Sequence, residues 1–308
     1  MPHMHFRDIE SPEPEEEVEL VTITEPGLVF GMSDETYHAD PVEGGSLSSS
    51  FARRLTEHVP AKAFAWHHNR KPTATMNLGK AAHLFALGAG PELIVWQHDG
   101  RTKAGKEERA GYSEHIAAER VVAVTETERR QVVGMVEALR GNPEVAAMLD
   151  AGTPEVSVFW QERGAWCRGR FDLLGDIGDD YKTAEDASPS GFQHSMSTYG
   201  YHQQADFYLR GLRAVDHPAG DRPMRFICQE KAAPYLVQVH TCDELAMEIA
   251  AALNDRAIDI FAAAVASGEW AGYPEITPPP TALPTHYFFR YADIIPERLN
   301  PFADPEDF

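Results

Sequence analysis

The stretch from Arg168 to Lys182, RGRFDLLGDIGDDYK, constrains the fold more than any other part of the chain. Its first half is rich in Phe and Leu and alternates in part, as a strand does. Gly175-Asp176 and Gly178 then supply a turn, and Asp180-Tyr181-Lys182 starts the return strand. The stretch therefore predicts a β-hairpin.

The hairpin brings charged residues onto shared faces, because side chains two positions apart on a strand point the same way. Arg170 and Asp172 should share one face, and Asp180 and Lys182 another, whereas Asp179 should face away from Lys182. If the register joins these faces, two carboxylates and one ammonium converge. Such a group can hold a hard divalent cation and hydrolyse a phosphodiester. The alternative is a surface hairpin with solvated charges, since a lone Asp-x-Lys is common.

The composition fits a globular chain that is strongly acidic. Of its 308 residues 43% are hydrophobic, and 27 Lys+Arg against 48 Asp+Glu give a net charge of −21. This balance argues against a nonspecific basic coat for DNA, but a local basic patch or a bound metal can still dominate one site. Acidic residues crowd the chain between Asp8 and Glu19, so residues 1–24 are expected to be a disordered tail.

The cysteines and the hydropathy indicate a protein of a reducing compartment. Cys167, Cys228 and Cys242 lack metal-type spacing, and an odd number of cysteines without a signal peptide fits the cytoplasm. No apolar run is long enough to span a membrane, so no membrane contact is expected.

The order of elements predicts an α/β fold with a mixed sheet and helices on its faces. We expect a three-strand meander at Glu155–Trp160, Ala165–Leu174 and Ile177–Thr183, and two later strands from Arg225 and Tyr235. The first predicted helix begins near Ser48. Further helices are predicted at Met76–Gly88, from Thr125 or Thr127 to Arg140, in a short segment that ends at Leu149, at Gly191–Val215, and in a long segment that ends at Gly268.

Four residues on predicted helices are candidates for a site. Gln204 and Tyr208 are four residues apart and so share a helix face, with Tyr201 one turn earlier. Their alternative reading is an amphipathic helix with its aromatics packed inward. His83 is the polar residue of an apolar helix, and a lone histidine there can be a satisfied core residue as readily as a ligand.

The most basic stretch is RTKAGKEER. Its Arg101, Lys103 and Lys106 could grip phosphates, or they could open an ordinary charged helix. Glu155, at the start of the first meander strand, could be either an exposed acid at a strand end or a residue of the site.

Glu155, Asp172 and Asp-Tyr-Lys182, followed by YHQQADFY from Tyr201, resemble the PD-(D/E)xK nuclease superfamily. Within it the chain most resembles the RecB-like branch and the catalytic domain of RecE (exonuclease VIII) with its phage and prophage relatives. The resemblance runs from near Tyr37 to the GEWAGYP exit and rests on several motifs in order, which is more specific than one of them. It implies a restriction-endonuclease-like core over residues 25–275, with 276–308 as a C-terminal extension.

The resemblance also implies roles for single residues. Asp172 and Asp180 match metal ligands, joined by His83, and Lys182 matches the catalytic lysine. Glu155 matches an acid that acts through metal or water. Gln204 and Tyr208 are expected to position either DNA or the lysine. The other residues expected to contact DNA are Tyr201, Arg170, Arg101, Lys103 and Lys106.

The implied activity is Mg²⁺- or Mn²⁺-dependent degradation of DNA. RecE-like enzymes digest the 5′ strand of duplex ends for single-strand annealing recombination, so an annealing protein, a homo-oligomeric ring and the cytoplasm of a bacterial host are implied too. The alternatives are an endonuclease or a single-strand or flap nuclease of the same fold, a phage accessory protein that binds DNA without cutting, and a non-catalytic metal-binding protein.

The chain departs from the family pattern in two respects. No proline stands directly before Asp172, and the net charge is acidic for a processive DNA enzyme. A basic channel would have to be local, and the residues expected to build it are Arg53, Arg54, Arg101, Lys103, Lys106, Arg168 and Arg170.

Overall fold

The computed structural model describes residues 21–68, 74–118 and 120–273. The chain divides after Trp270 into two compact units, and all the helices and strands of the described residues belong to the first. Residues 1–20 of the predicted tail and the whole predicted extension lie outside the described residues. Among those described, no helix is both long and apolar enough to cross a membrane.

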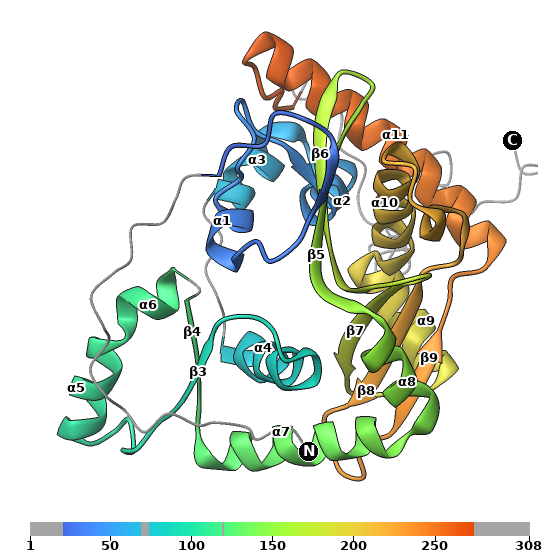
Figure 1. Cartoon of the computed structure of the whole chain (residues 1–308). Helices are drawn as coiled ribbons and strands as arrows, with labels where there is room; N and C mark the ends of the chain where they lie inside the picture. Colours follow the sequence, from blue (N-terminus) through green and yellow to red (C-terminus); the bar gives the residue numbers. More distant parts are fainter. Residues whose placement is uncertain (1–20, 69–73, 119, 274–308) are drawn as a thin grey trace, which may run out of the picture. The chain divides into compact units, whose positions relative to one another are not determined.

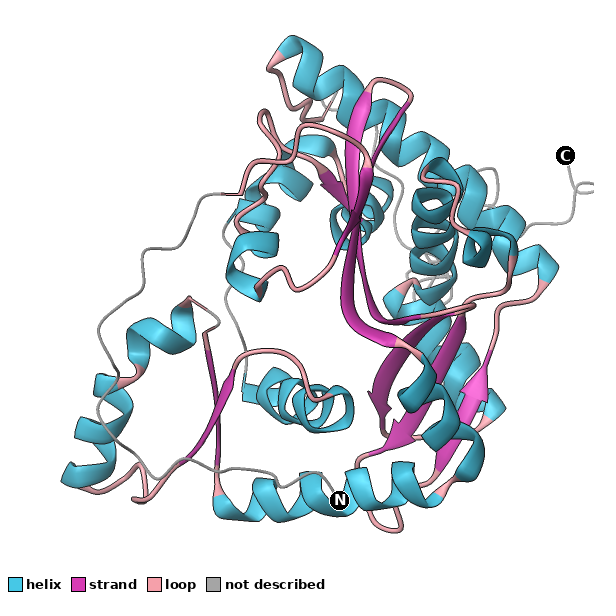
Figure 2. Cartoon of the chain, in the orientation of Figure 1, coloured by secondary structure: helices cyan, strands magenta, loops and turns pink. Residues whose placement is uncertain are grey.

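A seven-stranded mixed sheet forms the centre of the first unit, as predicted (Figures 1 and 2). The strand order is β1-β5-β6-β7-β8-β9, and β2 also pairs with β6. The β7–β8 and β2–β6 pairs are parallel and the others antiparallel. The strands are β1 (Gly27–Val29), β2 (Leu47–Ser48), β5 (Thr153–Glu162), β6 (Ala165–Leu174), β7 (Gly178–Ala184), β8 (Arg225–Glu230) and β9 (Val237–His240).

The predicted hairpin between β6 and β7 exists, but it is short. Only Leu174↔Gly178 and Leu173↔Asp179 pair, and β7 then runs parallel to β8. At the point of parting, the backbone N–H of Tyr181 donates to Oδ2 of Asp172 at 2.6 Å. A side-chain carboxylate thus replaces a strand-to-strand bond, and the sheet opens where the site residues stand.

One face of the sheet carries the largest buried cluster. Phe51, Phe207 and Phe261, each from a different helix, pack there with Val158 and Trp160 of β5. The two β5 residues are two apart and so face the same layer. The helices are α2 (Ser49–Glu57), α10 (Tyr201–Ala214) and α11 (Glu244–Ser267), with α3 (Pro60–His68) beside α2.

The opposite face is covered by a second helical layer. Ala82, Met135 and Leu139 form a buried cluster there with Tyr181 and Ile227 of the sheet. The helices are α4 (Ala74–Leu87), α7 (Glu126–Gly141), which opens on the predicted cap at Thr125, and α8 (Pro143–Ala151). The sheet is therefore flanked by helices on both faces.

Three parts of the chain differ from the prediction. The single helix predicted over Gly191–Val215 is wrong: α9 (Pro189–Tyr199) and α10 are separate, because Gly200 between them adopts a left-handed φ of +71°. The predicted strands also omitted a parallel pair beside α4, β3 (Glu92–Val95) and β4 (Val121–Val124), which are joined through α5 (Lys103–Gly111) and α6 (Ser113–Ala117). In addition, α1 (Asp34–His38) forms where a turn was expected.

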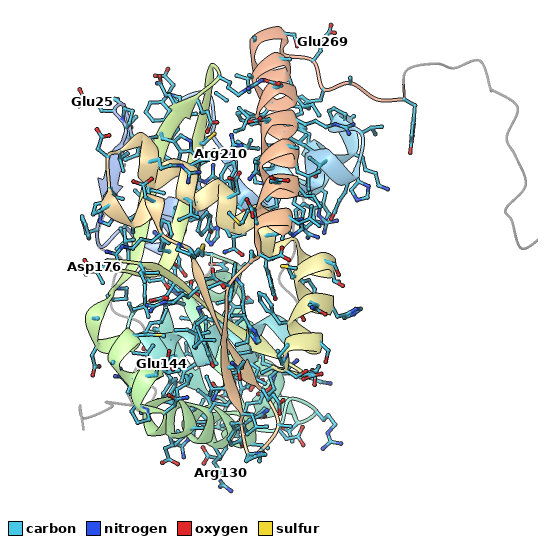
Figure 3. The ribbon with its side chains drawn as sticks, turned by 90° about the vertical axis from the view of Figure 1, so that its right-hand side faces the viewer. Glu25, Arg130, Glu144, Asp176, Arg210 and Glu269 are labelled. Atoms are coloured by element: carbon cyan, nitrogen blue, oxygen red, sulfur yellow. The ribbon has the colours of Figure 1, made fainter. Side chains whose placement is uncertain are left out.

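Arg210 anchors α10, the helix that carries Gln204 and Tyr208 (Figure 3). Its guanidinium donates to Asp206 at 2.6 Å, to Glu162 of β5 at 2.6 Å and to Asp255 of α11 at 2.7 Å. Partly buried charges that are paired on several sides in this way hold packed elements in one register. The network therefore fixes the position of α10 relative to the sheet and to α11.

Candidate active site

Three side chains meet at the point where β6 and β7 part. Ligand atoms of His83 from α4, Glu155 from β5 and Asp172 from β6 lie within 4.8 Å of one another. The flanking pairs Pro154↔Leu173 and Val156↔Phe171 place Glu155 opposite Asp172, and Nδ1 of His83 lies 3.5 Å from Oδ2 of Asp172. One imidazole and two carboxylates form a donor set that suits a divalent cation such as Mg²⁺ or Mn²⁺.

Glu155 is held in this group at an energetic cost. Its φ of +53° is left-handed, which costs a non-glycine residue roughly 1–3 kcal/mol. Burial, together with the charges of Asp172 and Asp34, raises the pKa of Glu155 to about 8. A strained backbone and crowded carboxylates are both typical of functional sites, including sites that bind a cation.

Asp172 shares this crowding. Burial raises its pKa to about 6, although nearby His83 and Lys182 lower it, and Asp180 raises it further. Because Tyr181 donates its backbone N–H to one oxygen of Asp172, the carboxylate is fixed in direction. These two acids are therefore placed before any ion arrives.

Asp180 and Lys182 share a face, as predicted, and form an ion pair with 2.5 Å between Nζ and Oδ2, in which Asp180 is buried and Lys182 partly exposed. Gln204 donates to the other oxygen of Asp180 at 2.6 Å. Burial lowers the pKa of Lys182, but the carboxylates of Asp180 and Asp172 outweigh it and raise the pKa above its ordinary value. Asp179 faces away, as predicted, and binds Arg225 at 2.6 and 2.7 Å.

The structure arranges the predicted ligands in two adjoining groups. His83 and Asp172 meet Glu155, while both oxygens of Asp180 are engaged by Lys182 and Gln204. The two groups act on each other electrostatically, since Asp180 raises the pKa of Asp172. Metal ligation by Asp180 stays a prediction, and it would require an oxygen of Asp180 to exchange partners.

The predicted DNA-contacting arginines next to Asp172 are buried. Arg170 is 8% exposed, donates to Asp34 at 2.6 Å and lies 3.7 Å from Glu155. Arg168 pairs with Asp40 and donates to the Ser46 backbone at 2.8 Å. Both guanidinium groups are committed to protein partners, so a direct contact of Arg170 with DNA is not favoured by its surroundings.

The basic residues predicted on RTKAGKEER lie on or next to α5, at the protein surface. The Arg101 side chain is 90% exposed and pairs with Asp99, and Lys103 is equally open. Lys106 is exposed as well. None of the three lines the cleft described next, so their binding of phosphates stays a prediction.

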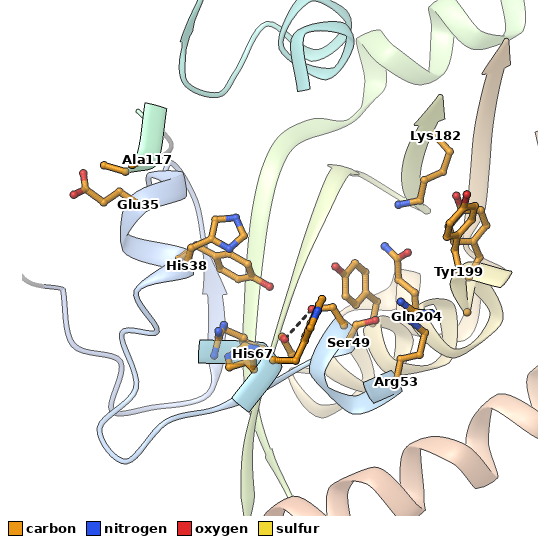
Figure 4. A pocket seen from close by; sticks show the side chains of 18 residues that line it. Glu35, His38, Ser49, Arg53, His67, Ala117, Lys182, Tyr199 and Gln204 are labelled. Carbon is orange, nitrogen blue, oxygen red and sulfur yellow. Dashed lines mark hydrogen bonds between the residues drawn. The ribbon is translucent and has the colours of Figure 1, made fainter. Parts of the chain in front are cut away.

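A cleft of about 550 Å³ adjoins the ion pair (Figure 4). It is bounded by α1 and α6 on one side and by β7 and α10 on the other, with the start of α2 between them. Predicted residues that line it are Lys182, Tyr201, Gln204, Tyr208, Arg53 and Arg168. Gln204 and Tyr208 do share a face, and the ammonium of Lys182 lies 5.2 Å from the centre of the Tyr201 ring.

Several supporting residues were not predicted from the sequence. Tyr181, between Asp180 and Lys182, turns its ring to within 5.0 Å of the His83 ring. Its hydroxyl donates to buried Gln229 at 2.6 Å, and Gln229 donates in turn to the α7 backbone. Period-two alternation could have placed Tyr181 on the face opposite Lys182, but its partners are far away in sequence.

Comparisons with known proteins bear on the family and the fold. A family model for a PDDEXK-like domain of unknown function (DUF3799) matches residues 48–276. A predicted exonuclease from Eubacterium rectale has a similar structure, with a TM-score of 0.57 and 11% identity over 86% of this chain and 100% of that chain. A phage-related exonuclease from Haemophilus somnus 129PT aligns with a TM-score of 0.32 and 9% identity, over 73% and 96% of the two chains.

No curated protein matches the sequence. At 11% identity the Eubacterium rectale structure supports the fold alone, and the family model covers well over half of the chain. The predicted PD-(D/E)xK fold is thereby confirmed, and the chain belongs to the PDDEXK-like family DUF3799.

Proposed function

We propose that the protein is a metal-dependent DNA exonuclease that acts on linear duplex ends. The observation that carries the proposal is the Lys182–Asp180 ion pair beside the His83, Glu155 and Asp172 cluster. A structural ion pair alone would not need three further ligand-type side chains next to it. Nucleases of this fold generally use divalent metals, which agrees with that donor set.

The cation would be held by His83, Glu155 and Asp172, and the family resemblance adds Asp180. When bound, a divalent ion supplies Lewis-acid charge to a phosphoryl oxygen. In its absence, Arg170 supplies positive charge 3.7 Å from Glu155. We therefore assign Arg170 the role of holding the acid cluster together rather than of contacting DNA.

Lys182 would orient the attacking water and stabilise charge that develops on the phosphorus oxygens. Hydrolysis then forms a bond from the water oxygen to phosphorus and breaks the bond from phosphorus to O3′, and one proton of the water ends on the leaving 3′ oxygen. Asp180 holds the ammonium in place at 2.5 Å, and Gln204 holds Asp180 at 2.6 Å. Because each member is fixed by the next, loss of Gln204 should weaken the positioning of Lys182.

The finer points of the proposal rest on the resemblance to RecE-like enzymes. These are 5′-to-3′ polarity, a role in phage-type recombination, a ring of identical subunits and a single-strand annealing partner. Tyr201, Gln204 and Tyr208 line the cleft and are the DNA contacts that the geometry supports best.

The experiment is digestion of a linear duplex labelled separately at its 5′ and 3′ ends, with Mg²⁺, Mn²⁺ or EDTA. A covalently closed circle of the same sequence is the control. Nucleotides released from the labelled 5′ ends, only from linear DNA and only with metal, support the proposal. Cutting of the circle supports an endonuclease instead, and DNA binding without cleavage in any metal contradicts the enzyme.

A further inference from the structure

Three aromatic rings form a stack that runs from the core to the cleft. Phe226 of β8 is fully buried, and its ring lies 5.5 Å from that of Tyr201, at 21° between planes. Tyr201 in turn lies 5.7 Å from Tyr199, at 29°. Tyr199 ends the stack with 57% of its surface exposed, so the outermost ring has an uncovered aromatic surface in a polar cleft.

The turn that presents Tyr199 is held from outside. Gly200 follows in its left-handed conformation, and Arg53 of α2 donates to the Thr198 carbonyl at 3.2 Å. Arg53 is itself paired with Glu57 at 2.9 Å. The exposed ring is therefore positioned by α2 and by Tyr201 beneath it, and ligand binding need not order it first.

The stack ends beside the proposed catalytic lysine. The ammonium of Lys182 lies 5.2 Å from the Tyr201 ring centre, and Tyr199, Tyr201 and Lys182 line one cleft (Figure 4). Trp66, whose ring carries the Arg54 guanidinium at 4.0 Å, lines the same cleft. Serines at the start of α2 and the cationic side chain of Arg53 line it as well.

Aromatic platforms beside cationic and hydroxyl groups are the surface that single-stranded nucleic acid binds, with bases stacked and phosphates paired. The size of the cleft agrees. About 550 Å³ falls in the range of small-ligand sites, roughly 300–1,000 Å³, which admits a nucleotide or two of one strand but not a duplex.

We infer that Tyr199 is a base-stacking platform, on which an unpaired base of the substrate strand adds the next ring to the stack while its phosphate reaches Lys182. The inference rests on the proposed nuclease function and adds to it that the strand enters the site unpaired. Duplex ends must then fray before cleavage, and Tyr199 takes up the freed base.

The test is binding of a fluorescein-labelled oligo(dT) of eight nucleotides, measured by anisotropy in EDTA with the full chain. Tyr199→Ala should weaken binding about 5- to 150-fold, the loss expected for one stacked base, and Tyr199→Trp should retain it. Phe30→Ala is the matched control, because Phe30 is an exposed aromatic (61%) that does not line the cleft. It should bind as the wild type does.

The inference is overturned if Tyr199→Ala binds oligo(dT) as tightly as the wild type does. It is overturned equally if Phe30→Ala loses as much, since binding would then not be local to the cleft. Thermal unfolding of each variant shows that the fold is kept. Because binding is measured in EDTA, its outcome is separate from the proposed function. If the wild type does not cleave DNA but Tyr199→Ala still binds oligo(dT) more weakly than the wild type, only the nuclease proposal is contradicted.

Discussion

Metal binding should release protons, because the acids of the cluster are crowded before an ion arrives. The pKa of Glu155 is about 8 and that of Asp172 about 6 in the metal-free protein. At pH 7 these carboxyls are protonated in about 0.9 and about 0.1 of the molecules, respectively. A divalent cation binds the ionised forms, so it should displace about one proton in total.

The amount released should fall as the pH rises. At pH 9 only about 0.1 of the Glu155 carboxyls still carry a proton, so binding of Mn²⁺ should release about a tenth of a proton. The affinity for Mn²⁺ should accordingly rise about tenfold per pH unit near pH 7, more steeply below pH 6 where both acids are protonated, and level off above pH 8.

Isothermal titration calorimetry of Mn²⁺ binding, in buffers of different ionisation enthalpy, counts the protons directly. Glu155→Gln should reduce the release at pH 7 to about 0.1 of a proton, the share of Asp172. Glu144→Gln, at an exposed acid on α8, is the control and should release as the wild type does. Wild-type binding at pH 7 without proton release would refute the reasoning, as would a full proton released by Glu155→Gln.

Three further predictions concern stability. Gly200→Ala should cost about 1–2 kcal/mol in urea unfolding, because φ is +71° and the new Cβ would lie 2.5 Å from an arginine carbon, whereas Gly141→Ala has open space and should be near neutral. Arg210→Ala breaks a largely buried network and should cost about 3–5 kcal/mol, whereas Arg130→Ala on the surface should cost less than about 1 kcal/mol. Equal costs for the two glycine variants, or for the two arginine variants, would contradict the packing described. Folding raises the pKa of Glu155, so the stabilising effect of its protonated form is present below its unfolded pKa and is lost as the pH rises through about 8. The unfolding temperature of the metal-free wild type should therefore fall relative to that of Glu155→Gln between pH 5 and 8. A constant difference between the two unfolding temperatures would contradict this.

Local patterns predicted the parts of the fold that depend on neighbouring residues. Strand alternation predicted that Asp180 faces Lys182 and that Asp179 does not, and the ion pairs of both aspartates confirm it. Helix starts were also predictable, as at Thr125, because capping depends on residues three positions apart.

The prediction failed where one residue adopts an uncommon conformation. The pattern from Gly191 to Val215 is apolar at helical spacing, so the break at Gly200 was missed. Glycine inside a helix is tolerated, and only its left-handed φ separates a break from a continuation. That break is what places Tyr199 beside Tyr201 at the cleft.

The site itself depends on contacts that sequence patterns do not encode. Arg170 stands two residues from Asp172 and was predicted to bind DNA, but its ion-pair partner Asp34 is 136 residues away. The approach of His83 to Glu155 likewise depends on how α4 packs against the sheet. The family resemblance, and not the spacing, pointed to that histidine.

The most direct test of the central claim is metal-dependent cleavage of an end-labelled linear duplex by Lys182→Met, beside Lys231→Met. Lys231 is a second ion-paired lysine, bound to Glu185 and outside the cleft. We predict that the wild type and Lys231→Met cleave with Mg²⁺ or Mn²⁺ and not with EDTA, whereas Lys182→Met is slower by about 100- to 1,000-fold and still binds DNA. Cleavage by Lys182→Met at the wild-type rate, or cleavage undiminished in EDTA, would contradict the account.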